Sequence, residues 1–171
     1  MRCVALGLLL LPAVVLGAAS LPAGQDLSDL VLAHLDDRPA PLRALRGRVV
    51  ALIHEDRSTR PEQNQLLKEA LGAAAERHRG RFLLFALADV SSYDIWPARR
   101  FAKEALYKVA ATGASVLCDW KGVVRGRLGL RRGDSTLIVL STEGRVALLQ
   151  RGPHSTQEVR AVLERIGQLV Q

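Results

Sequence analysis

Three side chains able to exchange protons or bind metal ions stand together in the first half of the chain. His54, Glu55 and Asp56 follow the apolar run Val-Val-Ala-Leu-Ile, and Glu62 and Asp134 are expected near the same sheet edge. Imidazole and carboxylate groups at such an edge suit a metal site or general acid–base chemistry. Consecutive residues of an extended loop point in different directions, so three adjacent ligands rarely converge. We therefore expect a solvated polar loop over residues 54–58, with no metal and no cofactor.

The basic residue beside these acids has two interpretations. Arg57 directly follows Asp56 in the sequence. A guanidinium next to carboxylates forms an ion pair, and an exposed one binds an external anion. We expect Arg57 to pair with a carboxylate, and anion binding remains the alternative.

The chain has two cysteines, and they lie far apart in the sequence. Cys3 falls in the N-terminal segment that we expect to be removed, and Cys118 ends the apolar run Val116-Leu117-Cys118. A lone thiol in an apolar strand is expected to be buried, and burial raises the pKa of a thiol and makes it unreactive. A reactive thiol at Cys118 is the alternative.

Residues 1–19 predict a secretory signal peptide. Arg2 supplies the positive charge, residues 4–16 are mostly apolar, and small residues precede the expected cleavage after Ala19. The apolar run is shorter than the roughly 20 residues that span a bilayer. We therefore predict export to the periplasm or beyond, no stable membrane insertion after cleavage, and one domain over residues 20–171. An uncleaved anchor helix is the alternative.

The net charge of the chain is +7. A basic exported protein is attracted to the anionic surfaces of the cell envelope. The sequence shows no basic stripe interleaved with aromatic residues, so we expect no nucleic-acid partner. It also shows no phosphate-binding glycine loop and no set of Cys and His residues at metal-binding spacing.

Strands and helices alternate along the chain. Residues 49–53 predict a buried strand, and Thr59 with Glu62 fits a capping box that would start a helix there. The apolar run at residues 82–88 predicts a strand covered on both faces. A second helix is expected after Asp94, with an apolar face at residues 101, 105, 106 and 109.

The C-terminal part predicts a short strand, a hairpin and a helix. Residues 116–118 form the strand, and residues 136–140 and 146–149 form the hairpin. Ser155 and Glu158 fit a second capping box, which opens a helix with one apolar stripe. This order predicts an α/β fold: a three-layer sandwich in which helices cover both faces of a central mixed β-sheet.

Parts of this pattern resemble exported proteins of the thioredoxin-like and redoxin type. The resemblance lies in residues 42–53, 114–122 and 136–150. The turn Asp119-x-x-Gly122 and the hairpin Glu143-Gly144-Arg145-Val146 are typical of that group. Residues 57–70 and 133–158 are similar to the YtfJ-like family of small exported bacterial proteins. That resemblance implies a thioredoxin-like fold and export without a redox cysteine pair, and it implies no particular reaction.

Three positions differ from the redox enzymes that the chain resembles. Thr59 and Glu62 fall where those enzymes have two active cysteines, and Ser135 falls where they have a cis-proline. Disulfide exchange needs a thiolate and a resolving thiol, and neither a hydroxyl nor a carboxylate replaces them. The sequence therefore predicts a redox-inactive protein.

We expect such a protein to bind another envelope protein or a peptide, because the corresponding groove of the active relatives receives extended polypeptide. The expected binding surface consists of His54, Glu55, Asp56, Arg57, Asp134 and Thr136. Two alternatives remain open. One is an enzyme, either a thiol-dependent oxidoreductase or peroxidase-like protein that uses Cys118 or a protein whose acidic loop binds a metal. The other is a structural envelope component held by its basic surface.

Overall fold

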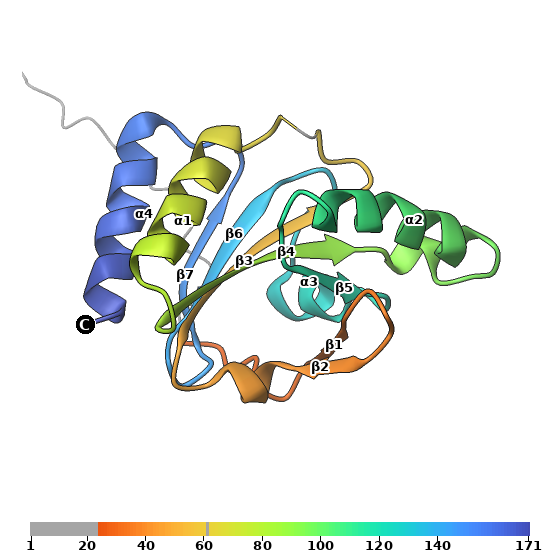
Figure 1. Ribbon diagram of the computed structural model, residues 1–171, viewed down its shortest axis with the longest axis horizontal. Helices are drawn as coiled ribbons and strands as arrows, with labels where there is room; N and C mark the ends of the chain where they lie inside the picture. Colours follow the sequence, from red (N-terminus) through yellow and green to blue (C-terminus); the bar gives the residue numbers. More distant parts are fainter. Residues whose placement is uncertain (1–23, 61) are drawn as a thin grey trace, which may run out of the picture.

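The computed structural model describes residues 24–60 and 62–171 (Figure 1). The predicted signal peptide, its cleavage after Ala19, and Cys3 therefore lie outside the described residues. The same holds for Pro61, within the loop that follows the first long strand.

Within the described residues, seven strands form one mixed sheet in the order β2-β1-β5-β4-β3-β6-β7. The strands are β1 (Val31–Ala33), β2 (Pro39–Pro41), β3 (Val49–Asp56), β4 (Phe82–Asp89), β5 (Val116–Asp119), β6 (Thr136–Leu140) and β7 (Val146–Arg151). The three central strands β3, β4 and β5 are parallel, and β6 and β7 join them antiparallel. The carboxyl ends of β3, β4 and β5 therefore share one edge of the sheet.

Helices cover both faces of this sheet (Figure 1). They are α1 (Gln65–Arg77), α2 (Ala98–Ala110), α3 (Val123–Leu128) and α4 (Thr156–Leu169), with short 3-10 turns at η1 (Leu42–Leu45) and η2 (Ser91–Tyr93). α1 and α4 pack side by side on one face over Ala51, Leu137 and Val139, and α2 covers the same face farther along, over β5. α3 and the N-terminal segment cover the opposite face.

The predicted α/β architecture is confirmed, and its C-terminal part closely matches the prediction. The first strand of the predicted hairpin is β6, with the predicted bounds. Ser155 caps α4 through its hydroxyl, which accepts from the backbone N–H of Glu158, and the Glu158 carboxylate accepts from the backbone N–H of Ser155. Val159, Val162 and Ile166 form the buried stripe of that helix.

The predicted start of the first helix is wrong. Thr59 and Glu62 form no capping box, because Thr59 is tied to the preceding strand: its hydroxyl accepts from the backbone N–H of Asp56, and its own N–H donates to the Asp56 carbonyl. The helix begins only at Gln65, after Asn64 in the left-handed conformation at φ 62°. The polar loop is also shorter than predicted, because His54 to Asp56 extend β3.

The prediction that β4 is covered on both faces is also wrong. Leu84 and Ala86 are only half-buried, because they line a groove between α1 and α2. The predicted apolar face of α2 is largely open as well, with Phe101 63% exposed and Val109 45% exposed. α1 and α2 therefore leave part of this face of the sheet uncovered between them.

Candidate functional site

The residues that the sequence assigned to a binding surface divide into buried and accessible groups. His54 and Thr136 are 1% and 0% exposed, so they do not belong to an accessible surface and their assignment to it is wrong. They are buried because His54 lies within β3 and pairs in register with Thr136, the first residue of β6. Glu55, Asp56 and Asp134 are half-buried, and Arg57 is exposed.

Ser135 is a junction between three elements. Its hydroxyl donates to Glu55 Oε1 at 2.7 Å, and Lys68 Nζ of α1 lies 2.7 Å from the same oxygen. Its carbonyl accepts from the backbone N–H of Gly152 and from Asn64 Nδ2. The cis peptide bond found in the described residues is Trp96–Pro97, so the bond before Ser135 is trans. The polar groups of this residue are thus used to hold the fold together.

A second polar contact, between Asn64 and His154, lies next to this junction, and the sequence analysis did not predict it. Asn64 is 6% exposed, and its Oδ1 lies 2.8 Å from His154 Nδ1. Burial lowers the pKa of His154, an effect partly offset by the nearby Glu158 carboxylate. The two residues are 90 positions apart, and no local motif links them. The left-handed conformation of Asn64 marks this residue as unusual, but it is visible only in the structure and not in the sequence.

Asp56 organises the loops at the sheet edge. Its carboxylate accepts from the backbone N–H of Ser58 at 2.8 Å and from that of Gly133 at 3.2 Å. Gly133 has a positive φ of 82°, which favours glycine at this position. One carboxylate therefore holds the loop after β3 against the loop before β6.

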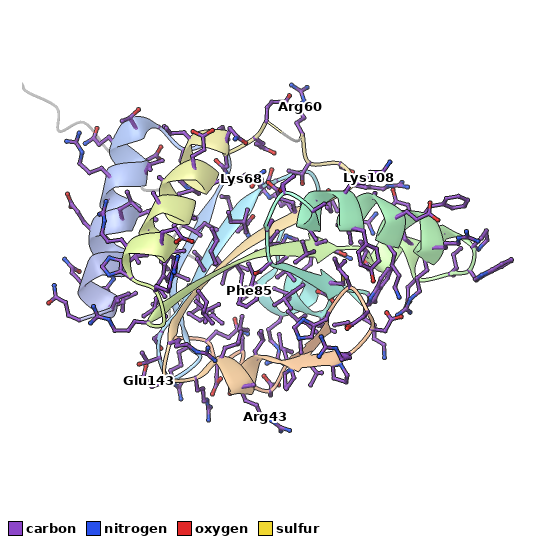
Figure 2. The ribbon with its side chains drawn as sticks, viewed as in Figure 1. Arg43, Arg60, Lys68, Phe85, Lys108 and Glu143 are labelled. Atoms are coloured by element: carbon purple, nitrogen blue, oxygen red, sulfur yellow. The ribbon has the colours of Figure 1, made fainter. Side chains whose placement is uncertain are left out.

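Arg57 does not form the predicted ion pair with a carboxylate in the described residues. Its guanidinium instead lies over the Tyr93 ring, 5.9 Å from the centroid. Arg60, Arg131 and Arg132 are also exposed in the two loops, and Figure 2 shows Arg60 projecting away from the fold. Glu62 is exposed in the turn before α1. The accessible part of the site is therefore rich in arginine.

A buried charged cluster lies beneath this edge. Asp89, at the end of β4, is 4% exposed and lies 2.7 Å from Arg125 Nε and 3.7 Å from His54 Nε2. Burial alone would raise the pKa of Asp89, but His54, Ser91 and Arg125 together lower it below its ordinary range. No group of three or more His, Cys, Asp or Glu side chains in residues 24–60 and 62–171 is arranged to hold a metal ion.

Cys118 is 1% exposed, in agreement with the predicted buried position. It packs with Val90, Val116 and Trp120 under α2. Burial, with a smaller contribution from the Asp37 carboxylate, raises the pKa of the Cys118 thiol to about 11. A thiol with that pKa carries little thiolate near neutral pH and is a poor nucleophile.

A bacterial family matches most of the chain. Its description reads "Bacterial protein of unknown function (YtfJ_HI0045)", and the match covers residues 42–169. The chain belongs to this family. The YtfJ-type resemblance inferred from the sequence is thereby confirmed.

Solved structures show which fold the family member adopts. A protein assigned as thiol:disulfide interchange protein DsbE, from Chlorobium tepidum, is 18% identical with a TM-score of 0.67, over 89% of this chain and 100% of that one. The exposed lipoprotein thioredoxin Etrx1 of Streptococcus pneumoniae is 16% identical with a TM-score of 0.60, over 82% and 99%. Peroxidoxin BcpB of Mycobacterium tuberculosis is 18% identical with a TM-score of 0.60, over 87% and 98%. The fold is therefore thioredoxin-like.

Two negative findings complete this description. No curated protein matches it with significance. Among the helices of the described residues, none is both long enough and apolar enough to cross a membrane.

Proposed function

We propose that the protein is a redox-inactive, exported thioredoxin-like module that binds an extended segment of another envelope protein or a peptide. The binding surface lies at the carboxyl end of β3. It comprises Arg57 and Asp134, with Glu55 and Asp56 behind them.

The observation that carries this proposal is a pair of charged side chains on two adjoining loops, neither of which has an ionic or hydrogen-bonding partner among the described residues. Neither Arg57 nor Asp134 forms an ion pair or side-chain hydrogen bond with a described residue. Asp56 holds the two loops together through the backbone N–H of Gly133. An extended peptide offers carbonyl groups to a guanidinium and N–H groups to a carboxylate, so it satisfies both side chains.

Redox inactivity is supported by the residues expected at a cysteine position and at the cis-proline position of the enzymes. Thr59 is tied to Asp56, and Ser135 is tied to Glu55 and Asn64. Cys118 is buried and its pKa is raised. None of these groups supplies an accessible thiolate, which disulfide exchange requires.

Export is supported by the sequence and by the kind of protein that shares the fold. Residues 1–19 have the charge and apolar pattern of a signal peptide. One structural neighbour is described as an exposed lipoprotein. The proposed location is the periplasm or the outer side of the cell.

Affinity capture from an envelope extract tests the binding surface. We expect Arg57→Ala and Asp134→Ala each to reduce recovery of the bound partner about tenfold, with melting temperatures close to that of the wild type. Arg160→Ala, at an exposed position of α4, is the matched control and should recover the partner fully. Equal recovery by all variants, or a parallel loss of thermal stability in the two site variants, would refute the assignment.

A further inference from the structure

An apolar pocket of about 360 Å³ lies between α2 and the sheet. Its apolar wall is formed by Ile53, Ala86, Ala88, Phe101, Leu106 and Val109. Small-molecule sites commonly have volumes of roughly 300–1,000 Å³ and mostly apolar walls. This volume and lining suit the apolar part of a small ligand.

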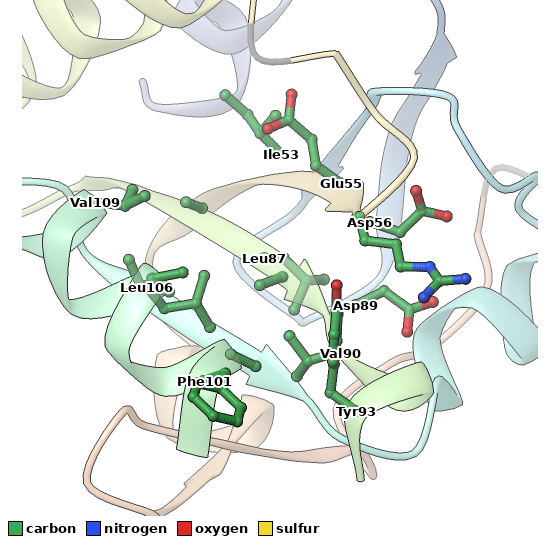
Figure 3. A pocket seen from close by; sticks show the side chains of 16 residues that line it. Ile53, Glu55, Asp56, Leu87, Asp89, Val90, Tyr93, Phe101, Leu106 and Val109 are labelled. Carbon is green, nitrogen blue, oxygen red and sulfur yellow. The ribbon is translucent and has the colours of Figure 1, made fainter. Parts of the chain in front are cut away.

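The polar groups of the pocket gather at one end. Figure 3 shows Asp56, Asp89 and Tyr93 together there, while Leu106 and Val109 lie toward the opposite end on α2. A small polar hollow adjoins this end. It is lined by Asp56 and Asp89, by Arg57 and Arg132, and by the serines at positions 58, 91 and 92. A ligand that fits both parts has an apolar body and one polar head.

The charges at this end favour an anionic head. Glu55 is paired with Lys68, and Asp89 is paired with Arg125. Asp56 remains without a cation, but Arg57 and Arg132 form no ion pair within the described residues. Among the side chains that line the pocket and the hollow, one positive charge is therefore left uncompensated, and a guanidinium binds a carboxylate in a two-pronged geometry.

The apolar part offers nothing to a peptide backbone. Ile53 lies on β3, which is paired with β4 and β6, and Ala86 and Ala88 lie on β4, which is paired with β3 and β5. Their backbone groups are already used within the sheet. A polypeptide inserted here would bury N–H and C=O groups without partners, at a substantial cost, whereas an alkyl chain has none to satisfy.

We propose that this pocket binds an aliphatic carboxylate, with the alkyl chain between α2 and the sheet and the carboxylate beside Arg57. The site shares Arg57 with the proposed peptide surface, and its alkyl part lies outside that surface. Ala105 lines the pocket from an exposed position of α2, so a change there tests the pocket alone.

Calorimetric titration with hexanoate, octanoate and decanoate tests the alkyl part. Burying each methylene should tighten binding about fourfold, or about fifteenfold for each step of two carbons. Binding should saturate at one ligand per chain. An affinity that does not depend on chain length would overturn the proposal.

Head-group probes test the carboxylate. We expect decanoate to bind more tightly than decanol and decylamine, and Arg57→Gln to remove this preference while Arg60→Gln keeps it. Arg60 is an exposed arginine of the same loop that does not line the pocket. Equal or tighter binding of decylamine would overturn the anionic head, and tighter binding of a neutral leucine dipeptide in this pocket would overturn the alkyl ligand.

A filling substitution tests the location. Ala105→Trp should weaken decanoate binding at least about tenfold and leave peptide capture intact, whereas Ala161→Trp, on the exposed face of α4, should change neither. Unchanged decanoate binding by a folded Ala105→Trp would refute the pocket. If that variant does not fold, the chain-length series and Arg57→Gln still decide the proposal.

Discussion

Ser135 Oγ donates a 2.7 Å hydrogen bond to Glu55 Oε1, and this bond joins the loop before β6 to the end of β3. The same Glu55 oxygen is 2.7 Å from Lys68 Nζ, so α1 is attached at the same point. From the sequence, we expect Ser135 at the position where the redox enzymes that the chain resembles have a cis-proline. Here it is a fully buried structural residue.

Ser135→Ala should therefore lower the free energy of unfolding by about 1.5 kcal/mol, as expected for loss of a buried hydrogen bond to a charged acceptor. Urea denaturation measures the change. Ser92→Ala, at an exposed position, is the control and should cost less than about 0.5 kcal/mol. If the two variants are equally stable, the junction contributes nothing.

The buried cluster around Asp89 predicts a specific acid sensitivity. Since the pKa of Asp89 is lowered in the folded protein, its charged form stabilises the fold above the unfolded-state pKa of about 3.9. That stabilisation is lost as the pH falls below this value toward the folded-state pKa. Asp89→Asn should remove this part of the pH dependence, which unfolding curves between about pH 6 and pH 2 will reveal.

At neutral pH, Asp89→Asn should cost about 2 kcal/mol. Removing one partner of a fully buried ion pair costs roughly 3–5 kcal/mol, and the cost is lower here because Arg125 is 26% exposed and keeps access to water. Glu164→Gln, an exposed position of α4, serves as the control. If the free energy of unfolding falls equally steeply with falling pH in Asp89→Asn and in the wild type, this account of the cluster is contradicted.

Loss of the capping box of α4 should lower the free energy of unfolding by less than Asp89→Asn does. Ser155→Ala removes the side chain that accepts from the Glu158 backbone N–H, so it should lower the free energy of unfolding by about 1 kcal/mol. Thr156→Ala, one residue later and exposed, should have little effect. Thermal denaturation of the two variants compares them directly, and equal melting temperatures would mean that the cap is not needed.

A local sequence pattern predicted the structure correctly where its residues form no competing contacts. Ser155 and Glu158 form a cap, and the side-chain hydrogen bonds of each within the described residues are made to the other. Thr59 and Glu62 show the same pattern and form none, because Thr59 bonds to Asp56 and Asn64 is drawn toward Ser135 and His154. A competing local bond and the long-range contacts of Asn64 together overrode the capping preference, and the sequence alone carries no signal of the long-range contacts.

The site was predicted less well than the fold, for two physical reasons. The end of β3 lies three residues beyond its apolar run, so His54 is buried and polar where the pattern indicated a loop. The gap between α1 and α2 depends on how the helices are spaced on the sheet. Apolar residues such as Leu84 and Phe101 look alike in sequence whether they lie in a core or in an open groove.

The rate at which hydrogen peroxide oxidises Cys118 tests the central claim of redox inactivity most directly. Peptide mass spectrometry follows this residue in the native protein and in the same protein unfolded in urea. With the thiol buried and its pKa raised to about 11, we expect the native rate to be at least about tenfold lower. A native rate above the unfolded one would show an activated thiol and contradict the account.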